Sequence, residues 1–268
     1  MNILLYQVDS FTSTPFRGNP AGVCILEKPM PDEWMQAVAS EMNLSETAFI
    51  QQESDDNYNL RWFTPSQEVS LCGHATLASA HIMHEQGLID TKQEIVFSTL
   101  SGELKATHTG DLIQMNFPAR PVSKLSAHDT TLEILNLPYK SAGASDFDYF
   151  VELESEEQII NYKPDIEVLK LLPLEGLIIT AGSENPTYDF ISRYFAPKLG
   201  IDEDPVTGSA HCSLAPYWSK ILGRTEMKGY QASKRGGEVI TRLDGKRVIL
   251  FGSAVTIMEC RLLNQSII

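Results

Sequence analysis

The sequence predicts an α+β fold of two pseudo-symmetric domains that arose by internal duplication. Three pairs of glycines are each separated by 135 residues: Gly73 and Gly208, Gly102 and Gly237, and Gly110 and Gly245. The segment RWFTP at 61–65 also resembles RYFAP at 193–197, which lies 132 residues further along. This period is too long for a solenoid repeat, so it indicates two similar domains of about half the chain each.

Each half has the same predicted order of elements, in which strands lead to a turn, a glycine opens a helix, and hairpins follow. The opening segment MNILLYQVDSFTS is typical of a strand, and TAFIQQ at 47–52 is typical of another. A helix is predicted from about Ala75 to Gln86, because Gly87 provides a C-terminal stop signal.

The second half predicts a matching helix in TGSAHCSLAPYWSKILGR, which ends at Gly223. Pro216 would kink or interrupt this helix unless its surroundings accommodate it. Two hairpin signals are present, HTGDL in the first half and RLDGKR in the second. The natural linker between the halves is NFPARPVSKL at 116–125. The second half starts with an acidic and less patterned region, SDFDYFVELESEEQIINYKPD. The predicted domains are 1–119 with 255–268, and 120–254.

The two predicted helices are rich in Ala, Ser and Leu and carry few charges, which is typical of buried helices. We therefore expect each domain to wrap its strands around one central helix. If the two halves face each other, the helix N-termini point into one cleft. Their free N–H groups would then form a two-sided anion site built from backbone amides.

Composition excludes several classes of protein. The 268-residue chain has a net charge of −14, which disfavours binding to a phosphate backbone. No apolar run approaches the roughly 20 residues that span a bilayer, and the N-terminus lacks the features of a signal or transit peptide. Four dispersed cysteines indicate a reducing cytoplasm. Neither Cys72 with His74 nor His211 with Cys212 has the spacing of a usual zinc motif, so we expect no metal.

Glu46 and His74 are the first candidates for chemistry. Glu46 precedes a strand and has apolar neighbours in MNLSETAFI, so burial would raise its pKa and suit it to proton shuttling. The alternative is that it only caps a turn. His74 follows the glycine that opens the first helix, and it is either a proton donor or substrate clamp, or a structural histidine.

The repeat supplies the remaining candidates. Asp204 precedes the second helix and can orient a ligand or His74, or it can only cap the loop. Ser209 takes the place of His74 in the second half and can bind a carboxylate or cap the helix. Cys72 and Thr207 are paired by the repeat, which excludes a symmetric pair of thiols. The chain has no GxGxxG, Walker, GxSxG or HExxH motif.

Four ordered segments give the chain a family resemblance: VDSFTSTPFRGNPAGVCIL, NLSETAFI, FTPSQEVSLCGHATLASA and DEDPVTGSAH. Together they closely resemble the phenazine-biosynthesis PhzF-like proteins, which share their architecture with diaminopimelate epimerase. The resemblance runs through almost the whole chain. It implies two barrel-like sheets, each around a central helix, with the site between the domains, a homodimer and no cofactor.

The resemblance also implies roles for particular residues. The family's motif residues fall on Glu46 as acid/base, His74, Asp204 and Ser209. Gly73 and Gly208 would supply amides to a small carboxylate substrate, and we place Cys72 and Thr207 beside them. The implied reaction is the relocation of a proton between carbons of an unsaturated cyclic or amino carboxylic acid. The family's named substrate does not carry over, because many PhzF-like proteins lie outside phenazine pathways.

Two alternatives stay open. Diaminopimelate epimerase has a cysteine at each helix start, whereas this chain has Cys72 and Thr207, which argues against epimerisation by two thiols. The first alternative is therefore a racemase, epimerase or dehydratase in which Cys72 alone acts as the base. A small-ligand-binding protein that has lost turnover is the third interpretation, and the joint presence of Glu46, His74, Asp204 and Ser209 weighs against it.

Overall fold

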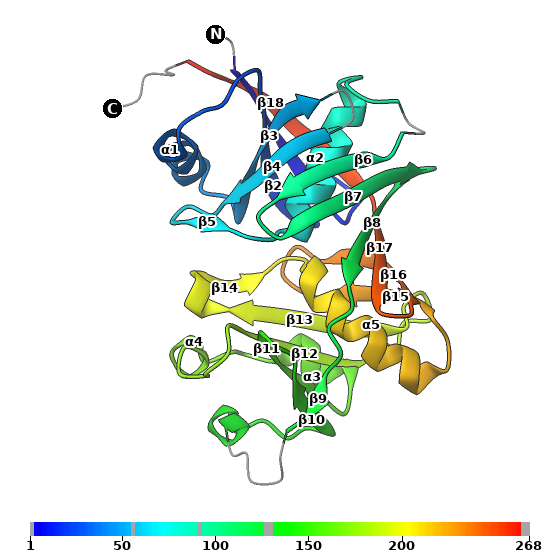
Figure 1. The fold of residues 1–268 in the computed structure, drawn as a ribbon. Coiled ribbons are helices and arrows are strands. Elements are labelled where there is room, and N and C mark those ends of the chain that lie inside the picture. Colours follow the sequence, from blue (N-terminus) through cyan, green and yellow to red (C-terminus); the bar gives the residue numbers. More distant parts are fainter. Residues whose placement is uncertain (1–2, 55–56, 91–92, 126–130, 264–268) are drawn as a thin grey trace. The chain divides into compact units, whose positions relative to one another are not determined.

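The computed structural model describes residues 3–54, 57–90, 93–125 and 131–263 (Figure 1). The chain forms two compact units: unit 1 contains 1–116 and 251–268, and unit 2 contains 117–250. The chain passes between the units within strands β8 (Leu112–Pro118) and β17 (Arg247–Gly252). No helix of the described residues has the length and apolar character that a membrane crossing requires.

Both units consist mainly of strands, with one long helix each. Unit 1 contains β1 (Ile3–Ser10), β2 (Asn19–Leu26), α1 (Asp32–Met42), β3 (Glu46–Ser54), β4 (Asn57–Phe63), β5 (Glu68–Val69), α2 (Gly73–Glu85), β6 (Ile95–Thr99), β7 (Gly102–Thr109) and β18 (Ala254–Leu262). Unit 2 contains β9 (Ser123–Lys124), η1 (Thr131–Leu135), β10 (Ser141–Ala144), β11 (Asp148–Glu152), α3 (Glu156–Asn161), α4 (Ile166–Leu169), β12 (Gly176–Gly182), β13 (Phe190–Ala196), η2 (Pro197–Leu199), β14 (Ile201–Asp204), α5 (Gly208–Leu222), β15 (Glu226–Gln231) and β16 (Gly237–Asp244).

Strand pairing repeats between the units, as the duplication predicts. In unit 1, β2 runs parallel to β3, β3 antiparallel to β4, β4 parallel to β6, and β6 antiparallel to β7. In unit 2, β11, β12, β13, β15 and β16 pair in the same order and with the same directions. After each set the chain crosses to the other unit within β8 or β17, and its next strand pairs there: β9 pairs with β10 in unit 2, and β18 pairs with β1 in unit 1.

An arginine–glutamate pair is duplicated as well. Arg61 on β4 donates through Nε and Nη2 to the two carboxylate oxygens of Glu68, at 2.7 Å each. Arg193 on β13 donates in the same way to Glu203, at 2.6 and 3.0 Å. Each guanidinium also lies over the ring of the phenylalanine two residues further along its own strand. Such two-point pairs hold the short strands β5 and β14 beside their neighbours.

The long helix of each unit packs against the unit's strands. α2 contacts β1, β2, β3, β7 and β18, and α5 contacts β15 and β16 (Figure 1). α2 begins at Gly73, two residues before the predicted start, and Gly87 follows its end with φ of 68°. α5 ends at Leu222, and Gly223 is its left-handed C-cap, as predicted.

α5 continues through Pro216 without interruption. Proline lacks the N–H that would bond the carbonyl of Cys212 four residues earlier. The backbone N–H of Arg120 donates to that carbonyl instead, at 2.9 Å. The sequence alone could not supply this partner, because it comes from a distant segment of unit 2.

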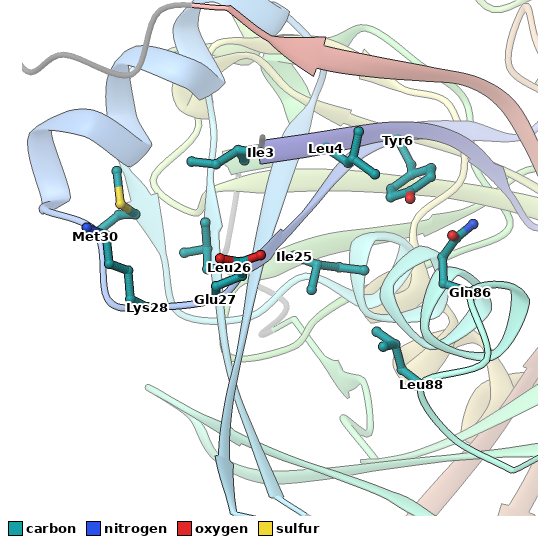
Figure 2. Close-up of a pocket in the computed structure, with 10 residues that line it drawn as sticks. All are labelled: Ile3, Leu4, Tyr6, Ile25, Leu26, Glu27, Lys28, Met30, Gln86 and Leu88. Carbon is teal, nitrogen blue, oxygen red and sulfur yellow. The ribbon is translucent and has the colours of Figure 1, made fainter. Parts of the chain in front are cut away.

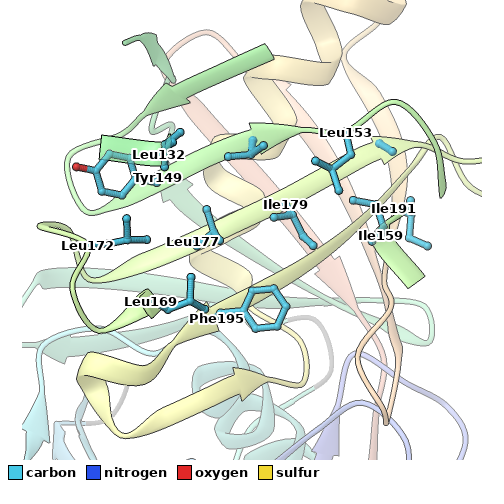
Figure 3. Packing of buried hydrophobic residues seen from close by; sticks show 12 residues of the cluster. Leu132, Tyr149, Leu153, Ile159, Leu169, Leu172, Leu177, Ile179, Ile191 and Phe195 are labelled. Atoms are coloured by element: carbon cyan, nitrogen blue, oxygen red, sulfur yellow. The ribbon is translucent and has the colours of Figure 1, made fainter. Parts of the chain in front are cut away.

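Each unit has apolar clusters of its own. In unit 2, a cluster of buried residues from the strands and short helices includes Tyr149, Ile179 and Phe195 (Figure 3). Strand β11 lies inside the acidic region at 145–165, for which the sequence pattern predicted no element, and all five residues of the strand are buried. In unit 1, Trp34 and Phe49 pack edge to face, with ring centroids 6.0 Å apart.

Candidate functional site

Glu46, Cys72 and His74 come together in unit 1. The Oε2 atom of Glu46 lies 3.2 Å from Nε2 of His74. The Sγ atom of Cys72 lies 3.4 Å from Nδ1 and 4.0 Å from Nε2 of the same imidazole. A carboxylate, an imidazole and a thiol therefore form one contiguous group, which we call the Glu46–His74–Cys72 cluster.

Two element ends position the cluster. Glu46 is the first residue of β3, and Cys72 is the extended N-cap of α2, with φ of −144°. His74 lies in the first turn of that helix, where its carbonyl accepts a hydrogen bond from the hydroxyl of Ser10 at 2.8 Å. The Ser10 side chain is fully buried, and it ties the start of α2 to the end of β1.

The cluster is nearly excluded from solvent. Glu46 is 9% exposed, Cys72 5% and His74 4%. Burial lowers the pKa of His74 to about 3, so the imidazole is neutral near pH 7. The neutral ring carries its proton on one of its two nitrogens, and its Nδ1 and the Cys72 thiol are within hydrogen-bond distance of each other. Its Nε2 places a polar atom 3.2 Å from the carboxylate of Glu46.

The unit 2 candidates form a second group around the start of α5. The hydroxyl of Thr207 donates to the carboxylate of Asp204. Gln231 on β15 joins both residues, since its Nε2 donates to the Asp204 carbonyl at 2.8 Å and to the Thr207 hydroxyl at 3.1 Å. Its Oε1 accepts from the backbone N–H of Thr207 at 2.8 Å. The amide of one buried glutamine therefore holds the segment that leads into the helix.

Gly208 and Ser209 follow Thr207 as the first two residues of α5, and Gly73 is the first residue of α2. Neither N-cap side chain bonds its own helix. The first N–H groups of both helices consequently have no capping side chain of the usual kind. The two groups of candidates belong to different units: Glu46, Cys72, Gly73 and His74 to unit 1, and Asp204, Thr207, Gly208 and Ser209 to unit 2.

The two units carry different residues at the start of the strand that Glu46 opens in unit 1. Glu46 opens β3 and Gly176 opens the matching strand β12, so unit 2 has no carboxylate at this position. The space beside Gly176 is filled by the Tyr194 hydroxyl, which donates to Asp148 at 2.8 Å. Burial raises the pKa of Asp148 to about 6. The duplicated framework therefore carries different acidic groups in its two halves.

Three residues that organise these groups were not predicted from the sequence, namely Ser10, Gln231 and Asp148. Gln231 had no local signal, because it ends strand β15, whose sequence EMKGYQ already mixes polar and apolar residues. Asp148 stands between aromatic residues in SDFDYFVE, which is a setting typical of a buried carboxyl group.

A separate pocket in unit 1 has a volume of about 340 Å³. Tyr6, Lys28, Met30, Gln86 and Leu88 are among its lining residues (Figure 2). It lies beside the C-terminal end of α2, whereas His74 is in the first turn of that helix. This pocket is therefore distinct from the Glu46–His74–Cys72 cluster.

Comparison with known proteins identifies relatives along the whole chain. The family model described as phenazine biosynthesis-like protein, PhzC-PhzF, matches residues 8–260. An uncharacterized isomerase of Halalkalibacterium halodurans is 47% identical over 264 residues, which cover 98% of this chain and 99% of the relative.

Solved structures agree with this result. A phenazine biosynthesis protein of the PhzF family from Enterococcus faecalis superposes with a TM-score of 0.92 at 39% identity, over 98% of this chain and 100% of that one. A predicted epimerase from Pseudomonas aeruginosa gives a TM-score of 0.77 at 19% identity, covering 98% and 99% of the two chains. The second likeness concerns the fold alone, and it places the α+β duplication among epimerase-like folds.

Proposed function

Because the chain belongs to the phenazine biosynthesis-like protein family, it is an isomerase, and we propose that it relocates a proton on a small unsaturated cyclic or amino carboxylic acid. Glu46 is the general acid/base of this proposal. The observation that carries it is the 3.2 Å contact between Glu46 Oε2 and His74 Nε2 in nearly buried surroundings.

The chemistry follows from one carboxylate acting twice. Glu46 takes a proton from one carbon of the substrate as that C–H bond breaks. The electron pair shifts along the unsaturated acid, and the protonated Glu46 gives the proton to another carbon as a new C–H bond forms. The carboxylate is regenerated, so the reaction consumes no other reagent. Neutral His74 orients Glu46 through both half-reactions.

In this proposal the substrate carboxylate binds to backbone amides. The N–H group of Gly73 lies in the first turn of α2, and those of Gly208 and Ser209 lie in the first turn of α5; at each helix start, taken by itself, the helix dipole favours an anion. Asp204 and Thr207 would contact polar groups of the substrate, and Gln231 holds these two residues in place. The protein's net charge of −14 does not oppose such binding, because the donors act locally.

A second candidate function has support from one contact. Cys72 Sγ lies 3.4 Å from Nδ1 of His74, and an imidazole at this distance can accept the thiol proton. The resulting thiolate would act as the base of a racemase, epimerase or dehydratase. The two candidates differ in which side chain takes the proton from carbon.

Deuterium incorporation tests the proposal. The protein is incubated in heavy water with a panel of small unsaturated and amino carboxylic acids, including dihydro-hydroxyanthranilate, and followed by NMR. Incorporation that is lost in Glu46→Gln supports the assignment and gives the substrate class. Incorporation that persists in that variant contradicts it.

Two further properties belong to the proposal. We expect a homodimer, which size-exclusion chromatography with light scattering would establish. We also expect a cytoplasmic protein, since none of the four cysteines, all of which lie in the described part of the chain, forms a disulfide, as is usual in a reducing compartment.

A further inference from the structure

We propose that Arg120 and Phe147 form a binding site for a small carboxylic acid with an apolar ring. The ligand carboxylate binds the guanidinium of Arg120, and the ring of the ligand contacts the exposed part of the Phe147 side chain. Both residues belong to unit 2, whereas the Glu46–His74–Cys72 cluster belongs to unit 1. The inference therefore concerns a separate site and does not rest on the proposed function.

The chain repeats one arrangement of arginine and phenylalanine three times, and one copy lacks a carboxylate. In the described residues, three guanidinium groups lie over phenylalanine rings, with 4.7–5.2 Å from Cζ to the ring centroid: Arg61 over Phe63, Arg120 over Phe147 and Arg193 over Phe195. Glu68 accepts two hydrogen bonds from the first of these arginines, and Glu203 accepts two from the last.

The guanidinium of Arg120 has no such partner. Within the part of the chain that the structure describes, its side chain forms no ion pair and no hydrogen bond, and its contact is with the Phe147 ring. The planar set of N–H donors matches a carboxylate, which takes two parallel hydrogen bonds from it. A ligand carboxylate can therefore take the place at Arg120 that Glu68 and Glu203 take in the other two copies.

The backbone around Arg120 is held in place without a ligand. The N–H of Arg120 donates to the carbonyl of Cys212 on α5, and the N–H of Ala119 donates to the carbonyl of Lys246, at 2.9 Å each. Pro121 follows Arg120 and restricts it to extended conformations. A ligand consequently meets a guanidinium on a fixed backbone, which lowers the entropy that binding costs.

The aromatic side of the site is fixed as well. The carbonyl of Phe147 accepts from the N–H of Glu175 at 2.9 Å, and the next residue opens β11. The Phe147 side chain stays 42% exposed although a guanidinium lies over its ring, so apolar surface is open to a ligand. The neighbouring Asp148 does not occupy the guanidinium, because it is 2% exposed and its Oδ1 accepts from the Tyr194 hydroxyl at 2.8 Å.

Local charge favours an anion at this place. Burial raises the pKa of Cys212 to about 12, and the positive charges of Arg120 and Arg247 both act against this rise. Two guanidinium groups therefore lie near the same buried thiol in unit 2. The net charge of −14 belongs to the chain as a whole, whereas the nearest donors govern the binding of a small anion.

NMR of the arginine side chains tests the site in the full chain, with benzoate as the probe and benzamide as its uncharged counterpart. The Nε–H signal of Arg120 is the one that disappears in Arg120→Gln. We expect benzoate to shift this signal in the wild-type protein. Benzamide should need a concentration about tenfold higher or more for the same shift, because it lacks the charge that strengthens the hydrogen bonds.

Two variants that keep Arg120 give the affinity at this signal. Phe147→Leu removes the ring, so benzoate should bind several-fold more weakly. Arg261→Gln is the matched control for charge, since it removes an exposed arginine from β18 of unit 1. Its benzoate affinity at the Arg120 signal should stay within about twofold of wild type.

Arg120→Lys keeps the positive charge and loses the planar set of donors. Equilibrium dialysis with radiolabelled benzoate should show one bound molecule per chain fewer in this variant than in wild type and in Arg261→Gln. Urea midpoints of the variants establish that they fold.

Four results would overturn the inference. One is an Arg120 signal that benzoate does not shift, and another is equal benzoate binding by Arg120→Lys and wild type. A shift at lower concentrations of inorganic phosphate than of benzoate would replace the carboxylate by a phosphate ligand. A change of oligomeric state in Arg120→Lys without a benzoate effect at Arg120 would assign the guanidinium to an acidic side chain of a second copy. None of these readings requires turnover, so the site and the proposed reaction fail separately.

Discussion

The carboxylate of Glu46 and the imidazole of His74 meet at 3.2 Å, although they belong to a strand start and a helix start that lie far apart in the sequence. Each of the two residues is less than one-tenth exposed. The contact gives a buried carboxylate a polar neighbour that is neutral near pH 7, so the carboxylate can exchange protons without a fixed counter-charge.

Cys72→Ala separates the two candidate functions. If Glu46 moves the proton, the variant should retain kcat to within about tenfold, because loss of a true acid or base costs about 10²–10⁴-fold. The measurement is the initial rate of deuterium incorporation for wild type and variant. A folded but inactive Cys72→Ala protein would favour the thiol as base instead.

Gln231→Leu should disturb the start of α5 while nearly preserving side-chain volume. Removing the amide leaves the Thr207 N–H and the Asp204 carbonyl without this partner in a buried place, so we expect a loss of about 1–3 kcal/mol in the free energy of unfolding. Urea denaturation measures this loss. Gln52→Leu on the exposed end of β3 is the control and should stay within about 0.5 kcal/mol of wild type.

Gln231 also has a positioning role in the proposed function. The conservative variant Gln231→Glu keeps the acceptor for the Thr207 N–H but loses the donor toward Asp204. We expect its kcat for proton exchange to fall, while its free energy of unfolding stays closer to the wild-type value than that of Gln231→Leu. Equal kcat in wild type and both variants would contradict a role for this amide in the site.

Gly229→Ala should destabilise unit 2 by about 1–3 kcal/mol, which is the usual cost of overpacking. A methyl group there would lie 2.5 Å from Cζ of Phe190 and 3.2 Å from Nε2 of His211, both buried. Gly182→Ala is the matched strand control, since its methyl group would meet only Trp218, at 3.9 Å. Equal urea midpoints for the two variants would contradict this packing.

His211 predicts a pH dependence of stability. Burial lowers its pKa to about 4, from 6.5, and its Nδ1 contacts the Thr207 carbonyl at 2.8 Å. Between these values the unfolded chain binds a proton that the folded chain does not. The contribution of this group is therefore fully present above pH 6.5 and is lost as the pH falls toward 4.

The expected loss between pH 7 and pH 5 is about 2 kcal/mol from this histidine. His211→Asn keeps a donor toward the Thr207 carbonyl and cannot titrate. Urea denaturation at both pH values should show a smaller decrease for the variant than for wild type, whatever its stability at pH 7. Parallel decreases would show that His211 does not titrate with a lowered pKa.

Much of the fold could be predicted because the duplication leaves local signals. Glycines that open or stop helices recur at one spacing, and Gly87 and Gly223 both follow the ends of their helices with positive φ. The passage of α5 through Pro216 could not be predicted, because it depends on a hydrogen bond from Arg120, far away in the chain. The predicted domain limits, 1–119 with 255–268 and 120–254, stay a prediction that limited proteolysis would test.

The candidate site was predictable only in part. Motifs indicated Glu46, His74, Asp204 and Ser209 one at a time, and their roles stay predictions. The contact between Glu46 and the start of α2 depends on how β3 packs beside that helix, which no local pattern contains. Gln231 escaped notice for the same reason, since its three bonds all reach segments that precede it by more than 20 residues.

The most direct test of the account is the rate of deuterium transfer to carbon in Glu46→Gln, measured by NMR in heavy water with the best substrate of the panel. The amide has nearly the same shape but cannot take a proton, so we predict a loss of at least about 10²-fold with wild-type stability and ligand binding. A Glu46→Gln rate equal to that of wild type would contradict the central claim that this carboxylate moves the proton.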